Sequence, residues 1–165
     1  PLYVAVSTDT GCFQYSNTTA DTHRVAAALM DTGIDVFPLN KRHFRTKSWA
    51  RLQVERLLTE RMHRYEGGKI AVAPVSLSLM DEAGATEEDM EDIAAFLETS
   101  VTIRELAEGG CKLSVRTSGG LNATKVCALL GGGGHAAAAG CTVSGTLVEA
   151  EAAILDAIRQ VEARA

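Results

Sequence analysis

The sequence predicts an α/β protein in which a mixed β-sheet is flanked by helices. Two observations lead to this prediction: short β-prone runs alternate with amphipathic helical runs, and glycine pairs or capping residues stand between them. The chain has 165 residues, enough for one ordinary domain or two small ones. No apolar run approaches the roughly 20 residues that span a bilayer, so we expect no membrane segment.

The first half of the chain contains three predicted elements. Leu2–Ser7 is a short, apolar, β-prone strand. Thr18 to Asp21 resembles a capping box, which opens a helix that ends near Gly33. A second helix is predicted from about Ser48 to Tyr65, and Gly67-Gly68 ends it. Its apolar stripe is Val54, Leu57, Leu58, Met62 and Tyr65.

The second half continues the alternation. Lys69–Val75 is predicted as a strand and Thr86–Leu97 as an acidic helix. The runs 101–106 and 112–117, separated by a glycine pair, indicate a hairpin. Asn122 is placed to cap a short helix that ends at Leu130. The remaining elements are a strand over 141–144 and a final helix, opened by a capping box of Thr146 and Glu149.

Four consecutive glycines, Gly131 to Gly134, precede His135, four alanines and Gly140. Glycines expose backbone N–H groups and adopt positive φ at no steric cost, and arrays of N–H groups bind anions. A histidine adds a donor whose charge changes near neutral pH. Two interpretations stay open here, a loop that cradles a phosphate and a tight corner between a strand and a helix.

The basic residues are unevenly distributed. Half of them stand between Lys41 and Arg64, where eight Lys and Arg face only Glu55 and Glu60. That segment carries about +6, and the rest of the chain about −11. A basic segment beside a cleft would attract a phosphate-bearing ligand, whereas the same pattern also describes the solvated face of an amphipathic helix.

Cysteines and aromatic residues restrict the function further. Cys12, Cys111, Cys127 and Cys141 form no CxxC pair, so we expect reduced, buried thiols in a cytoplasmic protein and no structural zinc site. Aromatic residues make up 5% of the chain and are scattered. A long stacking platform for single-stranded nucleic acid is therefore not expected, and a ligand of a few nucleotides fits better.

The front of the chain predicts an unusual domain organisation, because one strand and one helix cannot bury a core alone. One interpretation is the processed or engineered start of a complete domain. We prefer another, in which residues 1–40 are the last β–α unit of a truncated upstream domain. Residues 41–66 are then a basic connector helix, and residues 67–165 form a self-sufficient second domain.

Two groups of motifs resemble one family. Thr8-Asp9-Thr10-Gly11-Cys12-Phe13, with residues 15–19 after it, resembles the last motif of the catalytic domain in DHH phosphoesterases. Ser114-Val115-Arg116-Thr117, Asn122, the Gly131–His135 run and Ala138 to Gly140 resemble the DHH-associated C-terminal domain. The most similar subgroup is the RecJ-like branch of nanoRNases and bacterial cyclic-dinucleotide phosphodiesterases. The resemblance covers nearly the whole chain.

The resemblance implies a metal-dependent hydrolase. Family members act on short oligonucleotides, linear or cyclic dinucleotides or bisphosphorylated adenosine, and two manganese ions in the catalytic domain activate water. Of the family's metal ligands this chain has only Asp9, and no Asp-His-His triplet occurs. The resemblance makes Asp9 a catalytic metal ligand, whereas composition alone indicates a turn residue. We expect a missing N-terminal catalytic domain in the same polypeptide, no activity in the isolated chain, and a homodimer as one arrangement.

The resemblance assigns substrate binding to the second domain. Arg116 would clamp a phosphate, Thr117 would add a hydroxyl contact, and Asn122 would bond the sugar or phosphate. His135 would act as a catalytic group facing the scissile phosphate, beside Gly131, Gly132, Gly133 and Gly134. The residues alone also fit an exposed strand-end Arg, an N-cap Asn and a buried His. Ala136 and Ala137 depart from the family, where Lys or polar residues are frequent.

A non-catalytic alternative stays open. A similar C-terminal domain occurs in alanyl-tRNA synthetases, where it contacts tRNA. The motif from Thr8 to Phe13 and the pair of Arg116 and His135 favour the enzyme.

Overall fold

The chain folds as two compact units in the computed structural model, which describes residues 1–90, 93 and 97–164. The N-terminal unit is Pro1–Lys47, and the C-terminal unit is Ser48–Ala165. Five of the twelve residues in the helix predicted over Thr86–Leu97, 91–92 and 94–96, lie outside the described residues, and the described ones include a 3-10 turn over Glu88–Met90.

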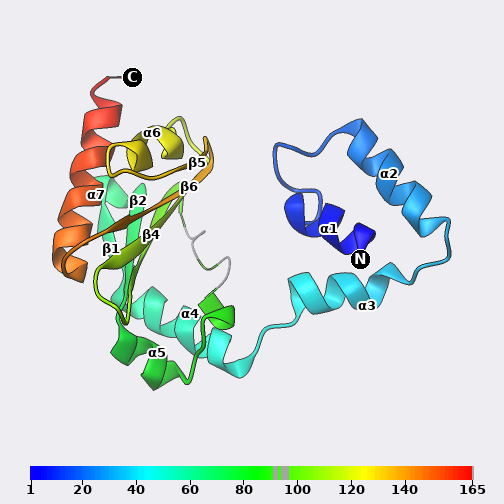
Figure 1. The fold of residues 1–165 in the computed structure, drawn as a ribbon, viewed down its shortest axis with the longest axis horizontal. Helices are drawn as coiled ribbons and strands as arrows, with labels where there is room; N and C mark the ends of the chain where they lie inside the picture. Colours follow the sequence, from blue (N-terminus) through cyan, green and yellow to red (C-terminus); the bar gives the residue numbers. More distant parts are fainter. Residues whose placement is uncertain (91–92, 94–96, 165) are drawn as a thin grey trace. The chain divides into compact units, whose positions relative to one another are not determined.

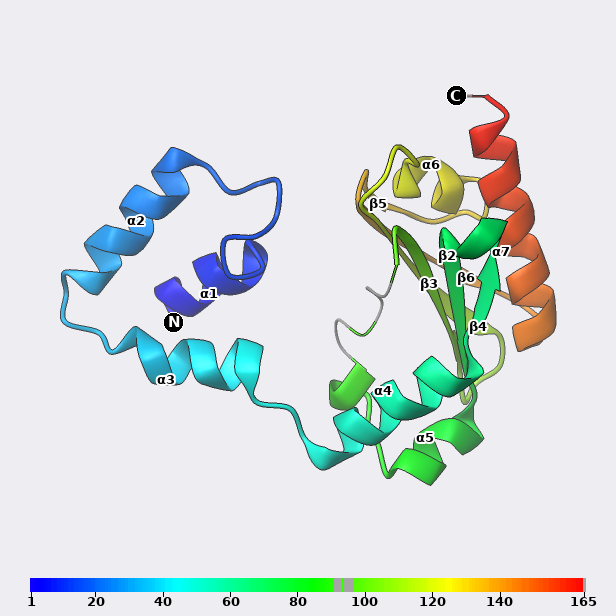
Figure 2. The same cartoon turned by 180° about the vertical axis from the view of Figure 1, so that it is seen from behind.

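A six-stranded mixed sheet forms the centre of the C-terminal unit, as Figures 1 and 2 show. The spatial order is β1-β2-β3-β4-β6-β5. Strands β2 and β3 are parallel, and every other neighbouring pair is antiparallel. The predicted mixed α/β sheet is therefore confirmed. Its strands are β1 (His63–Tyr65), β2 (Ile70–Val75), β3 (Thr99–Glu105), β4 (Cys111–Thr117), β5 (Gly133–His135) and β6 (Ala138–Val143).

Helices α6 (Ala123–Ala128) and α7 (Leu147–Glu162) cover one face of this sheet (Figure 1). Helix α7 presents Ala150, Ile154 and Ile158 to the strands, a spacing that puts all three on one helical face. Thr146 accepts a hydrogen bond from the Glu149 N–H, and the Glu149 carboxylate accepts one from the Thr146 N–H. The predicted capping box thus starts α7.

Helix α4 (Trp49–Arg61) buries Val54, Leu57 and Leu58 in a second core with residues of β2 and of α5 (Leu77–Ala83). The predicted helix over 48–65 ends early, because Arg64 and Tyr65 pair with β2 as part of the edge strand β1. His63 and Tyr65 both hydrogen-bond to one carboxylate oxygen of Glu151 on α7, at 2.8 and 2.7 Å. The helix that we expected to be a connector therefore packs as part of the C-terminal unit.

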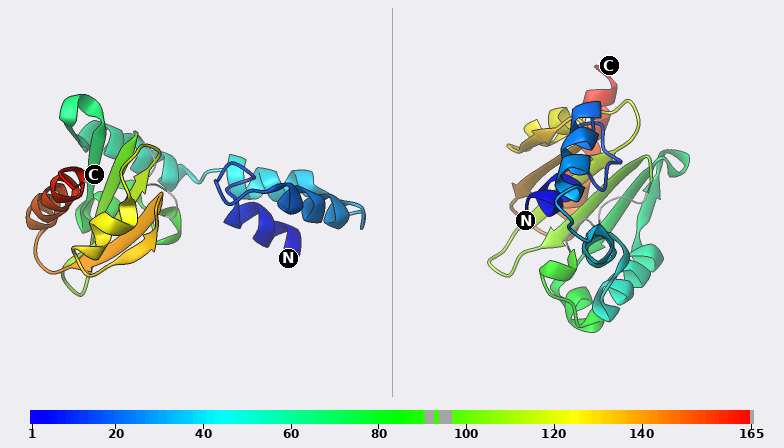
Figure 3. Two further views of the ribbon diagram at one scale, coloured as in Figure 1. Left: turned by 90° about the horizontal axis from the view of Figure 1, so that it is seen from above. Right: turned by 90° about the vertical axis from the view of Figure 1, so that its right-hand side faces the viewer.

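The N-terminal unit contains helices and loops only (Figure 3). These are α1 (Leu2–Asp9), α2 (Ala20–Met30) and α3 (Val36–Asn40), the last of which continues as a π-helical turn over Lys41–Arg45. The strand predicted over Leu2–Ser7 is wrong. A strand needs a neighbour for its backbone groups, and the unit offers none, whereas a helix pairs those groups within the segment.

Helix α2 forms where it was predicted, but its capping box is shifted by one residue: the N-cap is Thr19 with Thr22 as its reciprocal partner, instead of the box predicted from Thr18 to Asp21. The unit nevertheless has little core. Tyr3 and Ala26 are its buried apolar side chains, and many other large ones are exposed. The exposed ones include Leu2, Val25, Met30 and Phe37. Over the described residues, neither unit contains a helix long and apolar enough to cross a membrane.

Candidate functional site

The register of the sheet brings Arg116 and His135 together. Arg116 on β4 pairs with Ala138 on β6, and Ala138 pairs with His135 on β5. Residues that pair directly point to the same face, so the two side chains share a face and stand two strand spacings apart, about 10 Å. Val115 and Leu113 belong to the core under α6 and α7, so Arg116 lies on the opposite face.

The turn between β5 and β6 is hydrogen-bonded to the predicted residue Thr117 and to Ala123, which directly follows the predicted residue Asn122. The Thr117 N–H donates to the Ala137 carbonyl at 3.0 Å, and the Ala123 N–H donates to the Ala136 carbonyl at 2.8 Å. Ala136 and Ala137 therefore act through backbone carbonyls, which explains why alanine suffices there. Sequence reasoning missed this role because nothing in the side chains indicates it.

Asn122 and Thr117 are half-buried and already engaged. The Asn122 side-chain oxygen accepts the Lys125 N–H at 3.1 Å and so caps α6, as predicted. The Thr117 hydroxyl accepts the Gly119 N–H at 3.3 Å. The amide nitrogen of Asn122 has no hydrogen-bond partner among the described residues. A hollow of about 720 Å³ adjoins it, between α6, the end of α7 and the start of β2.

The first two glycines of the run form a turn after α6, and the last two belong to strand β5. Gly131 follows α6 with a φ of +75°, and the Gly132 N–H donates to the Cys127 carbonyl at 2.8 Å. Residues 133–135 then form β5, an exposed edge strand. An edge strand keeps one row of backbone donors and acceptors unpaired by the sheet, so part of the run can still meet a ligand.

Gly132 and Gly133 differ in the space that a side chain would find. A Cβ on Gly132 would lie 2.2 Å from the Gly140 carbonyl oxygen and 2.4 Å from the Cys141 Cβ, so the fold requires glycine there. A Cβ on Gly133 would meet nothing within 4 Å, and its φ is not positive. The fold therefore leaves the absence of a side chain at Gly133 unexplained, and close approach of a ligand is a standard reason for such a glycine.

The cysteines are free thiols; Cys111, Cys127 and Cys141 are buried, as expected, whereas Cys12 is only half-buried. Cys127 and Cys141 are buried beside Gly132. The neighbouring Cys141 side chain, together with burial, raises the pKa of the Cys127 thiol. This thiol therefore stays protonated at neutral pH and supports the glycine run by packing.

Asp9, the remaining predicted site residue, lies at the end of α1 in the N-terminal unit. It is exposed, and the Asn17 amide donates to its carboxylate at 3.1 Å. Within the described residues, no three His, Cys, Asp or Glu side chains gather closely enough to hold a metal ion. Asp9 by itself does not suffice for a pair of metal ions, since one carboxylate offers two oxygens and each ion needs several more ligands.

A protein-family model described as the DHHA1 domain matches residues 67–163. This chain belongs to the DHHA1 family. The match includes Arg116, Asn122 and the Gly131–His135 run, so the expected relationship to the DHH-associated domain is confirmed. The matched region begins after α4 and β1, although both of these elements pack against the rest of the C-terminal unit.

Individual relatives agree with this membership. The bifunctional oligoribonuclease and PAP phosphatase NrnA of Thermus thermophilus is 38% identical over 173 residues, which cover 100% of this DHHA1 chain and 51% of that protein. The chain thus spans about half of that curated relative.

Solved structures share the fold. An exopolyphosphatase-related protein of Bacteroides fragilis matches 93% of this chain and 47% of its own, with a TM-score of 0.82 at 24% identity. A pGpG-specific phosphodiesterase of Vibrio cholerae matches 99% of this chain and 55% of its own, with a TM-score of 0.52 at 12% identity.

Proposed function

We propose that this chain is the substrate-binding part of a metal-dependent phosphodiesterase or phosphatase. Its substrates would be short oligonucleotides, linear or cyclic dinucleotides, or bisphosphorylated adenosine. The observation that carries the proposal is that Arg116 and His135 lie on one face of the sheet. Beside them is Gly133, a glycine that the fold does not require. The 38% identical relative is itself an oligoribonuclease and PAP phosphatase.

The proposed chemistry divides between two domains. Arg116 would hold a phosphate through two parallel N–H donors, and unpaired N–H groups of the edge strand would add further donors. His135 would donate to a phosphate oxygen from the same face. Manganese ions, held mainly by residues of a longer protein with Asp9 as one ligand, would activate the attacking water.

A binding experiment tests the site. AMP and the dinucleotide pApA are titrated into the 15N-labelled chain, and amide shifts are expected to cluster at residues 131–135 and 116. We expect affinities near the millimolar level, equivalent to about −4 kcal/mol. Arg116→Ala should weaken binding by about 1.5–3 kcal/mol, the range for a hydrogen bond to a charged group. Gly133→Ala should weaken binding without lowering stability.

The matched control is Lys112→Ala, which removes an exposed cation from the same strand and the same face, four residues from Arg116. It should leave the affinity for AMP unchanged. If it weakens binding as much as Arg116→Ala does, the attraction is general and the assigned site is wrong. Binding of structured tRNA, with no response to AMP or pApA, would instead favour the non-catalytic module.

An activity assay tests whether hydrolysis needs metal ligands beyond those of this chain. The isolated chain with manganese and pApA should give no hydrolysis, because most metal ligands are assigned to other residues of a longer protein. Chelator-sensitive turnover by the isolated chain, lost in Asp9→Ala, would overturn that assignment.

A further inference from the structure

The structure places six of the eight Lys and Arg residues between Lys41 and Arg64 in two groups. On α4 the arginines pair with carboxylates: Arg51 with Glu55 at 3.0 Å, Arg56 with Glu60 at 2.9 Å, and Arg61 with Glu82 at 2.7 Å. An arginine in such a pair has its donors occupied and its charge offset locally. The sequence pattern alone does not reveal the pair of Arg61, because Glu82 lies 21 residues beyond it.

The second group is the basic cluster, which we define as Lys41, Arg42, His43 and Arg45. These side chains are all exposed and lie on the π-helical turn that continues α3. Among the described residues, neither Lys41, Arg42 nor Arg45 forms an ion pair or a side-chain hydrogen bond. Three fixed charges therefore stand within about 6 Å along the helix axis, with no carboxylate to offset them.

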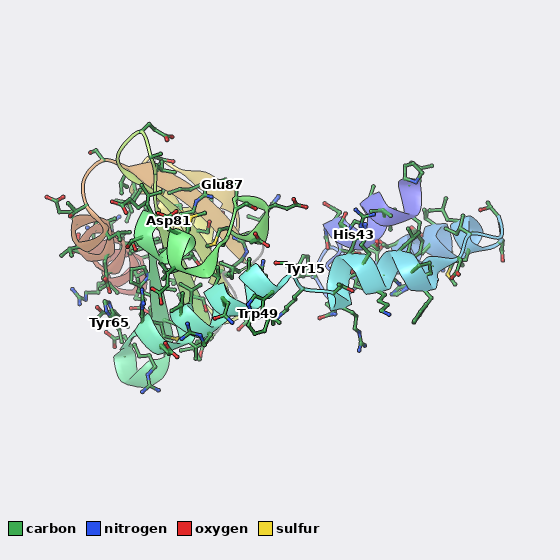
Figure 4. The ribbon with its side chains drawn as sticks, turned by 90° about the horizontal axis from the view of Figure 1, so that it is seen from below. Tyr15, His43, Trp49, Tyr65, Asp81 and Glu87 are labelled. Atoms are coloured by element: carbon green, nitrogen blue, oxygen red, sulfur yellow. The ribbon has the colours of Figure 1, made fainter. Side chains whose placement is uncertain are left out.

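Aromatic rings accompany the basic cluster. The rings of Phe44 and His43 are tilted against each other, with centroids 6.4 Å apart, and Phe44 is 37% exposed. Phe37, one helical turn before Lys41, is 72% exposed. Figure 4 labels His43 on this helix and draws the side chains around it. Exposed rings among unpaired cations match the stacking and charge pattern of surfaces that bind single-stranded nucleic acid.

We propose that the basic cluster binds the phosphate backbone of a single-stranded oligonucleotide longer than a dinucleotide. The choice of ligand rests on the proposed function. The cluster would add affinity for longer strands, because these offer its three fixed charges more phosphates than a dinucleotide does. Because the rest of the chain is strongly acidic, this surface is where an oligoanion gains attraction rather than repulsion.

A simpler role for these cations is to stabilise the helix end. Positive side chains near a helix C-terminus interact favourably with its carbonyl groups, by about 0.3–1 kcal/mol each. That role needs no ligand, and it predicts a loss of helix stability on neutralisation with no change in oligonucleotide affinity. A binding role predicts the opposite pattern, so one set of variants separates the two.

The test compares two triple variants of the 165-residue chain. The cluster variant is Lys41→Gln, Arg42→Gln and Arg45→Gln. The matched control is Arg24→Gln, Arg56→Gln and Arg61→Gln, which removes the same charge from exposed arginines that are each paired with a carboxylate. Fluorescence anisotropy gives the affinity of each protein for pApA and for a labelled 12-nucleotide single strand, without metal, between 50 and 200 mM salt.

We expect the cluster variant to bind the 12-nucleotide strand about tenfold more weakly at low salt, with pApA affinity changed less than twofold. The slope of log affinity against log salt should fall by about 2, since each single-strand phosphate contact contributes about 0.7. The control variant should keep both the affinity and the slope of the wild type. Circular dichroism should show α-helix content unchanged in both variants.

Three outcomes would overturn the proposal: equal losses in the two variants, no loss in the cluster variant, or binding of anionic lipid vesicles through these residues without binding of the strand. The Arg116→Ala variant separates this proposal from the proposed function. If pApA binding fails to depend on Arg116 while the 12-nucleotide strand still depends on the cluster, the site assignment fails and the cluster stands. The reverse pattern would leave the site and remove the cluster.

Discussion

The two units differ in how they satisfy their backbone and bury their apolar residues. The C-terminal unit has a six-stranded sheet with one core under α6 and α7 and a second under α4. The N-terminal unit buries Tyr3 and Ala26 and leaves Phe37, 72% exposed, at its surface. Both units contain a well-formed capping box, so good local signals are common to the two, and what the N-terminal unit lacks is a core.

This difference shows that helix signals and core formation are separate properties. Thr19 starts α2 as effectively as Thr146 starts α7, yet only α7 has a sheet to pack against. Most helix stability in proteins comes from tertiary packing rather than from local propensity. The N-terminal unit should therefore open easily, while the C-terminal unit unfolds cooperatively.

The largest expected effect comes from the core under α4. Leu58 is fully buried, so Leu58→Ala should lower the free energy of unfolding of the C-terminal unit by about 2–5 kcal/mol. Urea denaturation followed by far-UV circular dichroism measures it. Val25→Ala, at a half-exposed position of α2, is the comparison and should change stability by less than about 0.5 kcal/mol. Equal effects would mean that the two units share one core.

The same contrast predicts the pattern of amide exchange. In the wild type, amides of residues 1–40 should exchange quickly, and those of β2, β3 and β4 slowly. Leu58→Ala should speed exchange in the strands and leave the first 40 residues unchanged. Strong protection throughout the chain would contradict the division into a weakly held and a cooperative unit.

A second prediction contrasts two glycines of one run. Gly132→Ala places a Cβ against the Gly140 carbonyl and Cys141, backbone and core atoms that cannot move freely, so it should cost about 1–3 kcal/mol of stability. Gly133→Ala meets open space and should cost less than about 0.5 kcal/mol. Thermal denaturation of the two variants measures the difference. If both variants lose stability equally, β5 packs more tightly than the open space at Gly133 indicates.

The capping boxes allow a direct comparison of the units. Thr146→Ala should destabilise the C-terminal unit by about 1 kcal/mol, the usual cost of losing a Thr cap. Thr19→Ala loses an equivalent cap but should only lower helix content in the N-terminal unit, leaving the main unfolding transition in place. Circular dichroism and denaturation midpoints record both. A midpoint shift in Thr19→Ala would show that α2 folds with the sheet.

The smallest expected effect is a pH dependence of stability that comes from the capping box of Thr146 and Glu149 alone. Hydrogen bonds from the Thr146 N–H and hydroxyl lower the pKa of Glu149 from its ordinary value. A lowered pKa in the folded state means that this contribution is complete above the unfolded value, about 4.3, and is lost as pH falls through the lower folded value. Glu149→Gln should remove that part of the acid sensitivity, measured by denaturation midpoints from pH 6 to 3.

The box in the N-terminal unit is the control, because Thr22 is uncharged where α7 has Glu149. Thr22→Ala should weaken α2 equally at all these pH values. Acid sensitivity that persists in full in Glu149→Gln would assign the effect to other carboxylates.

The sequence by itself determined the locally encoded parts of this protein. The N-caps at Asn122 and Thr146 begin helices as predicted, α2 begins one residue from its predicted cap, and the hairpin of β3 and β4 forms around Gly109-Gly110. These features depend on residues within a few positions of one another, so periodicity and capping chemistry suffice. The motif residues of the DHHA1 match were also visible in the sequence.

Tertiary structure decided whatever depends on distant partners. Residues 2–9 became a helix because no strand was available to pair with them. The register of β4, β6 and β5 placed Arg116 and His135 on one face, a relationship between segments 19 residues apart. Glu82 neutralised Arg61, while Lys41, Arg42 and Arg45 kept their charge unpaired among the described residues. Local sequence fixes which elements can form, and long-range pairing decides which of their side chains meet.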